Sequence, residues 1–161
     1  MKKTAAIILC TVMLCLLSGC KSEWTVGIDI SSYDITDFYY TYENINFNAF
    51  YQRYRFYVEN GKQFFSYETR ERKGEYGPAT EKDVTRKGTI ELSSEEWERF
   101  FDHIKGGTVV PRKESVESGG RGPWLYLYWV NDKSRNQVFS FASAGDLAVF
   151  EEYCSGLAEG K

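Results

Sequence analysis

The residue types that most often carry catalysis are scarce in this chain. His103 is the single histidine. It falls within a segment, 93–105, that predicts a helix, but off the apolar stripe of Trp97, Phe101 and Ile104. A zinc site needs several histidine or cysteine ligands, and a serine or cysteine nucleophile needs a base beside it. We therefore expect a surface role for His103, and we predict no metal site, no cofactor and no catalytic residues.

Carboxylates are plentiful, yet their positions favour solvated surface. Glu95, Glu96 and Glu98 fall in the first turns of the predicted helix, where negative charge complements the helix dipole. Glu151 and Glu152 lie off the apolar stripe of a second predicted helix near the C-terminus. Glycoside hydrolysis needs two carboxyl groups that face each other across a cleft. A hydrolase whose carboxylates converge only in the fold therefore stays an alternative.

Two motifs of phosphate and acyl chemistry are missing. Gly119-Gly120-Arg121-Gly122 leads into a predicted strand, whereas a phosphate-binding loop follows a strand and opens a helix. The chain also has no Gly-x-Ser-x-Gly turn of the hydrolase type. The sequence thus favours a protein that is not an enzyme.

The N-terminus has the layout of a secretory signal peptide. Lys2 and Lys3 precede an apolar run over residues 5–17, and small residues follow at Ser18 and Gly19. The run is shorter than the roughly 20 residues that cross a bilayer as a helix. We therefore expect residues 1–19 to be a cleaved signal peptide and not a transmembrane helix.

Leu17-Ser18-Gly19-Cys20 resembles a lipobox, the motif of bacterial lipoproteins. The resemblance implies that a diacylglyceryl group is attached to the sulfur of Cys20 and that the preceding segment is removed. The alternative is an ordinary secreted protein with an incidental cysteine. Two acyl chains anchor a protein stably, since each buried CH₂ contributes roughly 0.8 kcal/mol. We expect a mature protein that begins at Cys20, sits on the outer face of the cell membrane and works outside the cytoplasm.

Composition fits one acidic domain. Without residues 1–19 the chain keeps 18 of its 20 basic residues and all 23 acidic residues, a net charge of −5. This charge disfavours nucleic acid as a partner and disfavours added adhesion to anionic lipids. We expect residues 20–32 to be the lipidated N-terminus and a tether, and residues 33–161 to be a single domain.

Cys154 is the one cysteine left after the lipidated residue. It shares an apolar helical stripe with Phe150 and Leu157, which favours burial over a reactive thiol or an intermolecular disulfide. The domain should therefore fold without a disulfide.

Alternating aromatic residues predict strands. The predicted strands cover 35–42, 50–59, 63–70, 85–92, 124–130 and 137–141. Asn60-Gly61 predicts a tight hairpin turn. The segments 71–82 and 108–122, rich in charge, Gly and Pro, predict loops, with short strands at 24–30 and 109–110 as alternatives to irregular chain.

Two helices complete the pattern. Ser93 and Glu96 form a capping box before the first helix, and Gly106-Gly107 ends it. The second helix follows Ser143. Short hairpin connections make neighbouring strands antiparallel. The predicted fold is therefore α+β, an antiparallel sheet of about six strands with two helices packed on one face.

One side of a strand is the candidate binding surface. Trp124, Tyr126 and Tyr128 share this side, because successive side chains of a strand alternate between faces. The opposite side, which suits the helices, carries Leu125, Leu127 and Trp129. We expect the tyrosine side to be an exposed surface for a protein or a carbohydrate, unless a loop or another layer covers it. Neighbouring strands could add Tyr51, Tyr57 and Tyr67.

The layout as a whole resembles small, uncharacterised surface lipoproteins of Gram-positive bacteria. The run of hairpins and of Trp- and Phe-rich helices also resembles emfourin-type protease inhibitors, although no inhibitory motif is shared. The leading hypothesis is a membrane-anchored, non-enzymatic module that binds an envelope protein or a glycan through the aromatic side or the loop 108–122. The alternatives are an inhibitor of an exported protease and a carboxylate-dependent hydrolase.

Lipidation at Cys20 is directly testable by mass. Protein extracted from membranes should carry acyl chains on a polypeptide that begins at Cys20, and Cys20→Ala should release or mislocalise the protein. Intact-mass spectrometry that finds an unmodified N-terminus with Lys2 and Lys3 would contradict the lipobox.

Overall fold

The computed structural model describes residues 23–43, 50–74, 77, 79–112, 122–132 and 137–160. The predicted signal peptide, the lipidation site Cys20 and residues 113–121 of the predicted loop 108–122 lie outside the described residues. In the part of the chain that is described, no helix is both long enough and apolar enough to cross a bilayer.

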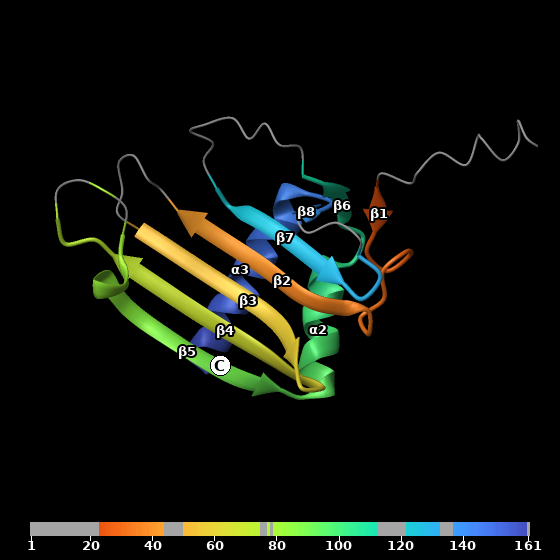
Figure 1. Ribbon diagram of the computed structural model, residues 1–161, viewed down its shortest axis with the longest axis horizontal. Coiled ribbons are helices and arrows are strands. Elements are labelled where there is room, and N and C mark those ends of the chain that lie inside the picture. Colours follow the sequence, from red (N-terminus) through yellow and green to blue (C-terminus); the bar gives the residue numbers. More distant parts are fainter. Residues whose placement is uncertain are drawn as a thin grey trace, which may run out of the picture.

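The described chain forms one antiparallel sheet with two α-helices (Figure 1). The elements are β1 (Trp24–Thr25), β2 (Ile35–Glu43), β3 (Phe50–Glu59), β4 (Lys62–Glu71), the 3₁₀ helix η1 (Glu81–Asp83), β5 (Val84–Leu92), α2 (Ser94–Ile104), β6 (Thr108–Pro111), β7 (Trp124–Trp129), β8 (Gln137–Ser140) and α3 (Ala144–Glu159). The strand order is β1-β6-β8-β7-β2-β3-β4-β5. The predicted α+β class is confirmed, and the sheet has eight strands, because the short strands β1 and β6 add to the six expected.

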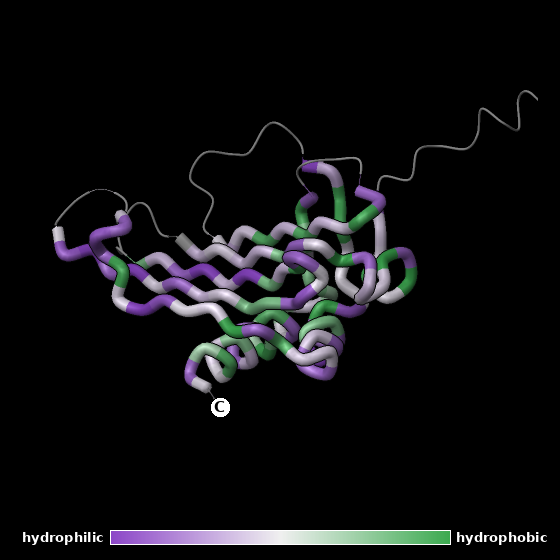
Figure 2. Tube along the Cα trace, turned by 60° about the horizontal axis from the view of Figure 1, so that its bottom comes forward, coloured by the Kyte–Doolittle hydropathy of each residue, from purple (hydrophilic) through white to green (hydrophobic). Residues whose placement is uncertain are grey.

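Both α-helices cover the same face of the sheet and bury an aromatic core there (Figure 2). The Phe38 ring in β2 lies 5.5 Å from Phe100 in α2 and 5.4 Å from Phe150 in α3. Phe56 in β3 stacks on Phe100 with ring centroids 4.0 Å apart. All four rings are fully buried. Burial of one such side chain contributes roughly 1.5–3 kcal/mol, so this cluster fixes the helices to the sheet.

Local signals set the ends of the elements as the sequence predicts. The Ser93 hydroxyl accepts a hydrogen bond from the Glu96 amide, and the Glu96 carboxylate accepts one from the Ser93 amide at 2.7 Å, which completes the capping box. Asn60 and Gly61 have φ of 52° and 74°, the positive values that a tight hairpin turn requires. β3 and β4 therefore pair in continuous register along their whole length.

The segment after β1 belongs to the folded domain. Val26 and Ile30 are each 1% exposed. The Ser32 carbonyl accepts a hydrogen bond from the indole nitrogen of buried Trp97 at 3.1 Å. The predicted tether over 20–32 therefore ends where β1 begins, because the apolar side chains beyond that point gain more from burial than from exposure in a linker.

Three further residues clarify the helix layer. Cys154 is fully buried, as predicted, and burial raises the pKa of its thiol. The prediction that Glu151 belongs to the solvated surface is wrong. Its carboxylate accepts a hydrogen bond from Tyr40 Oη at 2.7 Å, because this turn of α3 lies against β2. His103 is half-buried and stacks on Tyr153 of α3 with ring centroids 4.3 Å apart, so it packs between the two helices instead of standing free on the surface.

The stability of the domain should fall as His103 takes up a proton. Burial lowers the pKa of His103 below its ordinary value of 6.5, and Asp102 offsets part of this effect. A base with a lowered folded-state pKa binds a proton more readily when unfolded, so its contribution is complete above the unfolded pKa and is lost as pH falls through it. The melting temperature should therefore drop as the pH is lowered from about 7 to below the lowered folded-state pKa of His103.

His103→Gln should reduce this drop, because glutamine does not titrate. Thermal unfolding followed by circular dichroism across the interval provides the measurement. A pH dependence that the substitution leaves unchanged would show that His103 is not its source.

Candidate ligand-binding face

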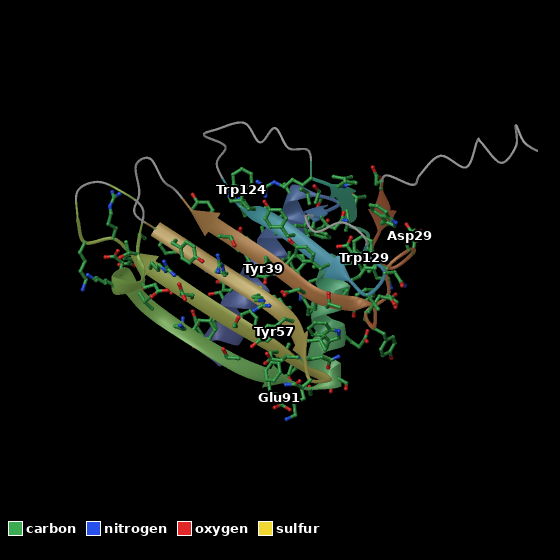
Figure 3. All side chains as sticks on the ribbon, in the orientation of Figure 1. Asp29, Tyr39, Tyr57, Glu91, Trp124 and Trp129 are labelled. Carbon is green, nitrogen blue, oxygen red and sulfur yellow. The ribbon has the colours of Figure 1, made fainter. Side chains whose placement is uncertain are left out.

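The face of the sheet turned away from α2 and α3 is covered by no other described element (Figure 3). Figure 3 shows Tyr39, Tyr57 and Trp124 on this side, with the helices behind the sheet. We call it the open face. Strand register places on it Trp124, Tyr126 and Tyr128 of β7, Asp37, Tyr39 and Thr41 of β2, Tyr51, Arg53, Arg55 and Tyr57 of β3, Phe64, Ser66, Glu68 and Arg70 of β4, and Lys87, Thr89 and Glu91 of β5.

Trp124, Tyr126 and Tyr128 lie together on the open face, and each is half-buried. Leu127, on the other side of β7, is fully buried under the helices. Tyr126 is paired with Tyr39 of β2 in the strand register. The ring of Tyr39 meets that of Tyr128 edge to face, with centroids 6.1 Å apart. The three aromatic residues predicted from the sequence are thus one flank of a wider aromatic surface.

The other three tyrosines singled out from the sequence fall differently. Tyr57 lies on the open face. Tyr51 also lies there but is only 6% exposed, beneath the guanidinium groups of Arg70 at 4.7 Å and Arg53 at 5.5 Å. Tyr67 belongs to the opposite face, because alternation along β4 directs it to the helices, where it packs against the core. Only Tyr57 therefore extends the accessible aromatic surface.

Arg55 is fixed near the centre of the open face. Its Nε and Nη2 donate to the two carboxylate oxygens of Asp37 at 2.9 and 2.5 Å. Its guanidinium lies over the rings of Tyr57 and Tyr39, at 4.3 and 5.0 Å from their centroids. The hydrogen bonds to Asp37 raise the pKa of Arg55, and burial, then the Asp37 charge, raises the pKa of Tyr39. A bidentate, stacked arginine of this kind is neutralised and held in one geometry.

Arg53 and Arg112 differ from Arg55, because no carboxylate of the described residues pairs with either. Arg53 stands opposite Glu68 in the register, but the Glu68 carboxylate accepts a hydrogen bond from Arg70 Nε at 2.6 Å. The Arg112 guanidinium lies 5.9 Å from the centroid of the Tyr126 ring. Arg53 on the open face and Arg112 beside it are therefore left without a neutralising partner among the side chains that the structure describes.

These two arginines border a shallow pocket of about 320 Å³, which we call the arginine pocket. Its walls are Thr41, Arg53, Arg112, Trp124 and Tyr126. The pocket thus combines two guanidinium groups, two aromatic rings and a hydroxyl, with no acidic side chain among the described residues of its wall. Such a set suits an anionic group attached to a flat, partly apolar body.

A second cavity adjoins the arginine pocket. β7 and β8 pair only at Tyr126↔Val138, and a space of about 480 Å³ opens where they diverge. Its walls are largely apolar and include Leu125, Phe139 and Leu147, and it shares Arg112, Trp124 and Tyr126 with the arginine pocket. The start of β7 therefore separates a cationic hollow from an apolar one.

The described residues offer little for catalysis. No cluster of three or more His, Cys, Asp or Glu side chains that could hold a metal ion occurs in the described ranges. A groove of about 510 Å³ between α2 and α3 contains Glu96, Glu152 and His103. The bonds that the Glu96 carboxylate accepts from Ser93 lower its pKa, the opposite of what a general acid requires.

No protein-family model, curated protein or solved structure matches this chain. The geometry of the open face therefore carries the functional inference.

The sequence singled out the aromatic residues of this face but not its arginines as binding residues. Arg53 and Arg55 alternate with buried residues of β3, so their share of a face with Tyr57 could be predicted from the sequence. Their position beside Trp124 depends on the strand order β7-β2-β3. That order joins segments more than sixty residues apart, and no local pattern encodes it.

The different settings of Arg55 and Arg53 predict different costs of substitution by lysine. Arg55→Lys keeps the charge but loses the bidentate bonds and the stacking on two rings, and should lower the free energy of unfolding by about 1 kcal/mol. Arg53→Lys should change it little, because Arg53 has no ion pair to lose within the described residues. Urea denaturation of both variants provides the measurement. Equal costs for the two substitutions would contradict the anchoring role of Arg55.

Proposed function

We propose that this protein is a lipid-anchored extracytoplasmic module that binds an acidic glycan on its open face and does not modify it. The arginine pocket is the observation that carries the proposal. It places two guanidinium groups, which have no acidic partner among the side chains that the structure describes, beside Trp124 and Tyr126.

The aromatic side chains favour a glycan as the ligand. Sugar rings have flat, weakly apolar faces that suit stacking on Trp and Tyr, and their hydroxyls need polar neighbours such as Thr41. Trp124 and Tyr126 are half-buried and project from a paired strand. Little side-chain freedom remains to be lost on binding, which favours affinity for a small contact area.

The charge of the pocket favours an acidic glycan over a neutral one. The expected mature chain has a net charge of −5 and would repel polyanions at long range. Charge interactions are screened beyond about 8 Å at physiological ionic strength. Within the pocket the two guanidinium groups therefore dominate the local electrostatic potential. Their geometry matches that of a carboxylate or a phosphate.

The neighbouring carboxylates support binding without catalysis. Asp37 and Glu68 lie on the open face together with Arg53 in the strand register, and both accept hydrogen bonds from arginines. Glycoside hydrolysis needs one carboxyl group that can donate a proton. Carboxylates held by arginine are poorly suited to that task.

The proposal can be tested with one polymer in two charge states. The full-length lipidated protein in detergent micelles should bind polygalacturonate, and it should not bind the methyl-esterified form, which has the same backbone without the charge. A glycerol-phosphate polymer tests phosphate in place of carboxylate. Isothermal titration calorimetry at two salt concentrations provides the affinities.

Trp124→Ala and Arg53→Gln should each weaken binding by about thirtyfold, as expected when a central contact worth about 2 kcal/mol is removed. Tyr33→Ala and Arg99→Gln are the matched controls, because both residues are exposed and lie away from the open face. Melting temperatures of all variants should stay within a few degrees of the parent protein. Equal binding of the esterified polymer, or no effect of either pocket substitution, would contradict the proposal. If the parent protein binds an envelope protein but no polymer, and Trp124→Ala abolishes that binding, then the ligand of the open face is a protein and not a glycan.

A further inference from the structure

Three large apolar side chains are held out into solvent at one end of the sheet. Ile28 is 82% exposed, Tyr33 is 87% exposed and Val130 is 66% exposed. They lie on the two turns between β1 and β2 and directly after β7, at the end of the sheet where β1 enters (Figure 1). The Val130 amide donates to the Asp34 carbonyl at 2.8 Å, which joins the segment after β7 to the second turn.

The turns themselves do not need these apolar residues. The Asp29 carboxylate accepts a hydrogen bond from the Thr25 amide at 2.7 Å, and the Asp34 carboxylate accepts one from the Ser31 amide at 3.0 Å. Polar residues therefore close both turns, as is usual. Ile28 and Tyr33 are carried on these closed turns with most of their surface in water, an arrangement typical of a contact site.

The predicted lipid anchor lies close to this end of the molecule. Cys20 precedes Trp24, the first residue of β1, by four positions. A fully extended chain spans at most about 3.6 Å per residue, so β1 starts within about 14 Å of the anchored residue. This end of the sheet must then lie at the membrane surface. The inference rests on the lipid anchor in the proposed function.

We propose that Ile28, Tyr33 and Val130 insert into the interfacial region of the bilayer and form a second membrane contact beside the acyl chains. A tyrosine suits this region, because its ring is apolar and its hydroxyl remains with the headgroups. Lys105 packs along Gly27 next to this site and adds a cation at headgroup level.

This contact also orients the binding site. β7 runs from Trp124 to Trp129, directly before Val130. Six steps along a strand at about 3.3 Å each place Trp124 up to about 20 Å farther from the bilayer than Val130. The arginine pocket then lies away from the membrane surface, where an envelope glycan can reach it.

The experiment uses the full-length lipidated protein in vesicles of phosphatidylethanolamine and phosphatidylglycerol that contain a nitroxide-labelled lipid. Tyr33→Cys introduces a site for a fluorophore, since Cys154 is buried and Cys20 is acylated in the proposed form. Glu71→Cys is the matched control, because Glu71 is exposed at the end of β4, at the opposite end of the sheet (Figure 1). The nitroxide lipid should quench the fluorophore at residue 33 and leave it unquenched at residue 71.

Two readouts separate the possible failures. Vesicle flotation reports the lipid anchor, and its absence would overturn the anchor and with it this inference. Flotation with equal quenching at residues 33 and 71 would overturn the second contact alone. A further variant with Ile28→Ser and Val130→Ser should float normally but should lose the quenching at residue 33, and retained quenching would contradict insertion of these side chains.

Discussion

The aromatic core between the helices and one face of the sheet is the interaction on which the rest of the structure depends. Phe38 and Phe56 of the central strands meet Phe100 and Phe150 of the two helices, and all four rings are removed from water. Because side chains alternate along each strand, the same packing turns every other residue outward. The open face is therefore a direct consequence of where the helices pack.

The outward residues of that face are not ordinary solvated side chains. Arg55 is clamped between Tyr39 and Tyr57 and paired with Asp37, which gives the centre of the sheet a fixed surface without a covering layer. At the β7 flank the pattern changes, because Arg53 and Arg112 have aromatic neighbours but no acidic partner among the described residues. Rigid support beside a pocket lined by two arginines is the arrangement expected of a site that binds an anion.

Much of this fold could be predicted from the sequence, because its signals are local. The capping box of Ser93 and Glu96, the turn at Asn60-Gly61 and the alternation along β7 each act over a few residues. The alternation along β7 was enough to predict that Trp124, Tyr126 and Tyr128 share one face of the sheet.

Other features could not be predicted because they depend on contacts distant in the sequence. The arginine pocket needs β2 between β3 and β7, and Glu151 turns to the sheet only because Tyr40 lies beneath it. The folding of residues after β1 into the domain depends on the buried indole of Trp97, more than sixty positions away.

The central claim is that the open face, and not the helix side, receives the acidic ligand. The indole N–H resonances in a ¹⁵N-correlated NMR spectrum test it most directly, because Trp124 lines the arginine pocket while the Trp97 indole is 1% exposed and bonded to the Ser32 carbonyl. On addition of polygalacturonate the Trp124 signal should shift and that of Trp97 should stay in place. A Trp124 signal that stays fixed while resonances of α2 and α3 move would contradict the account.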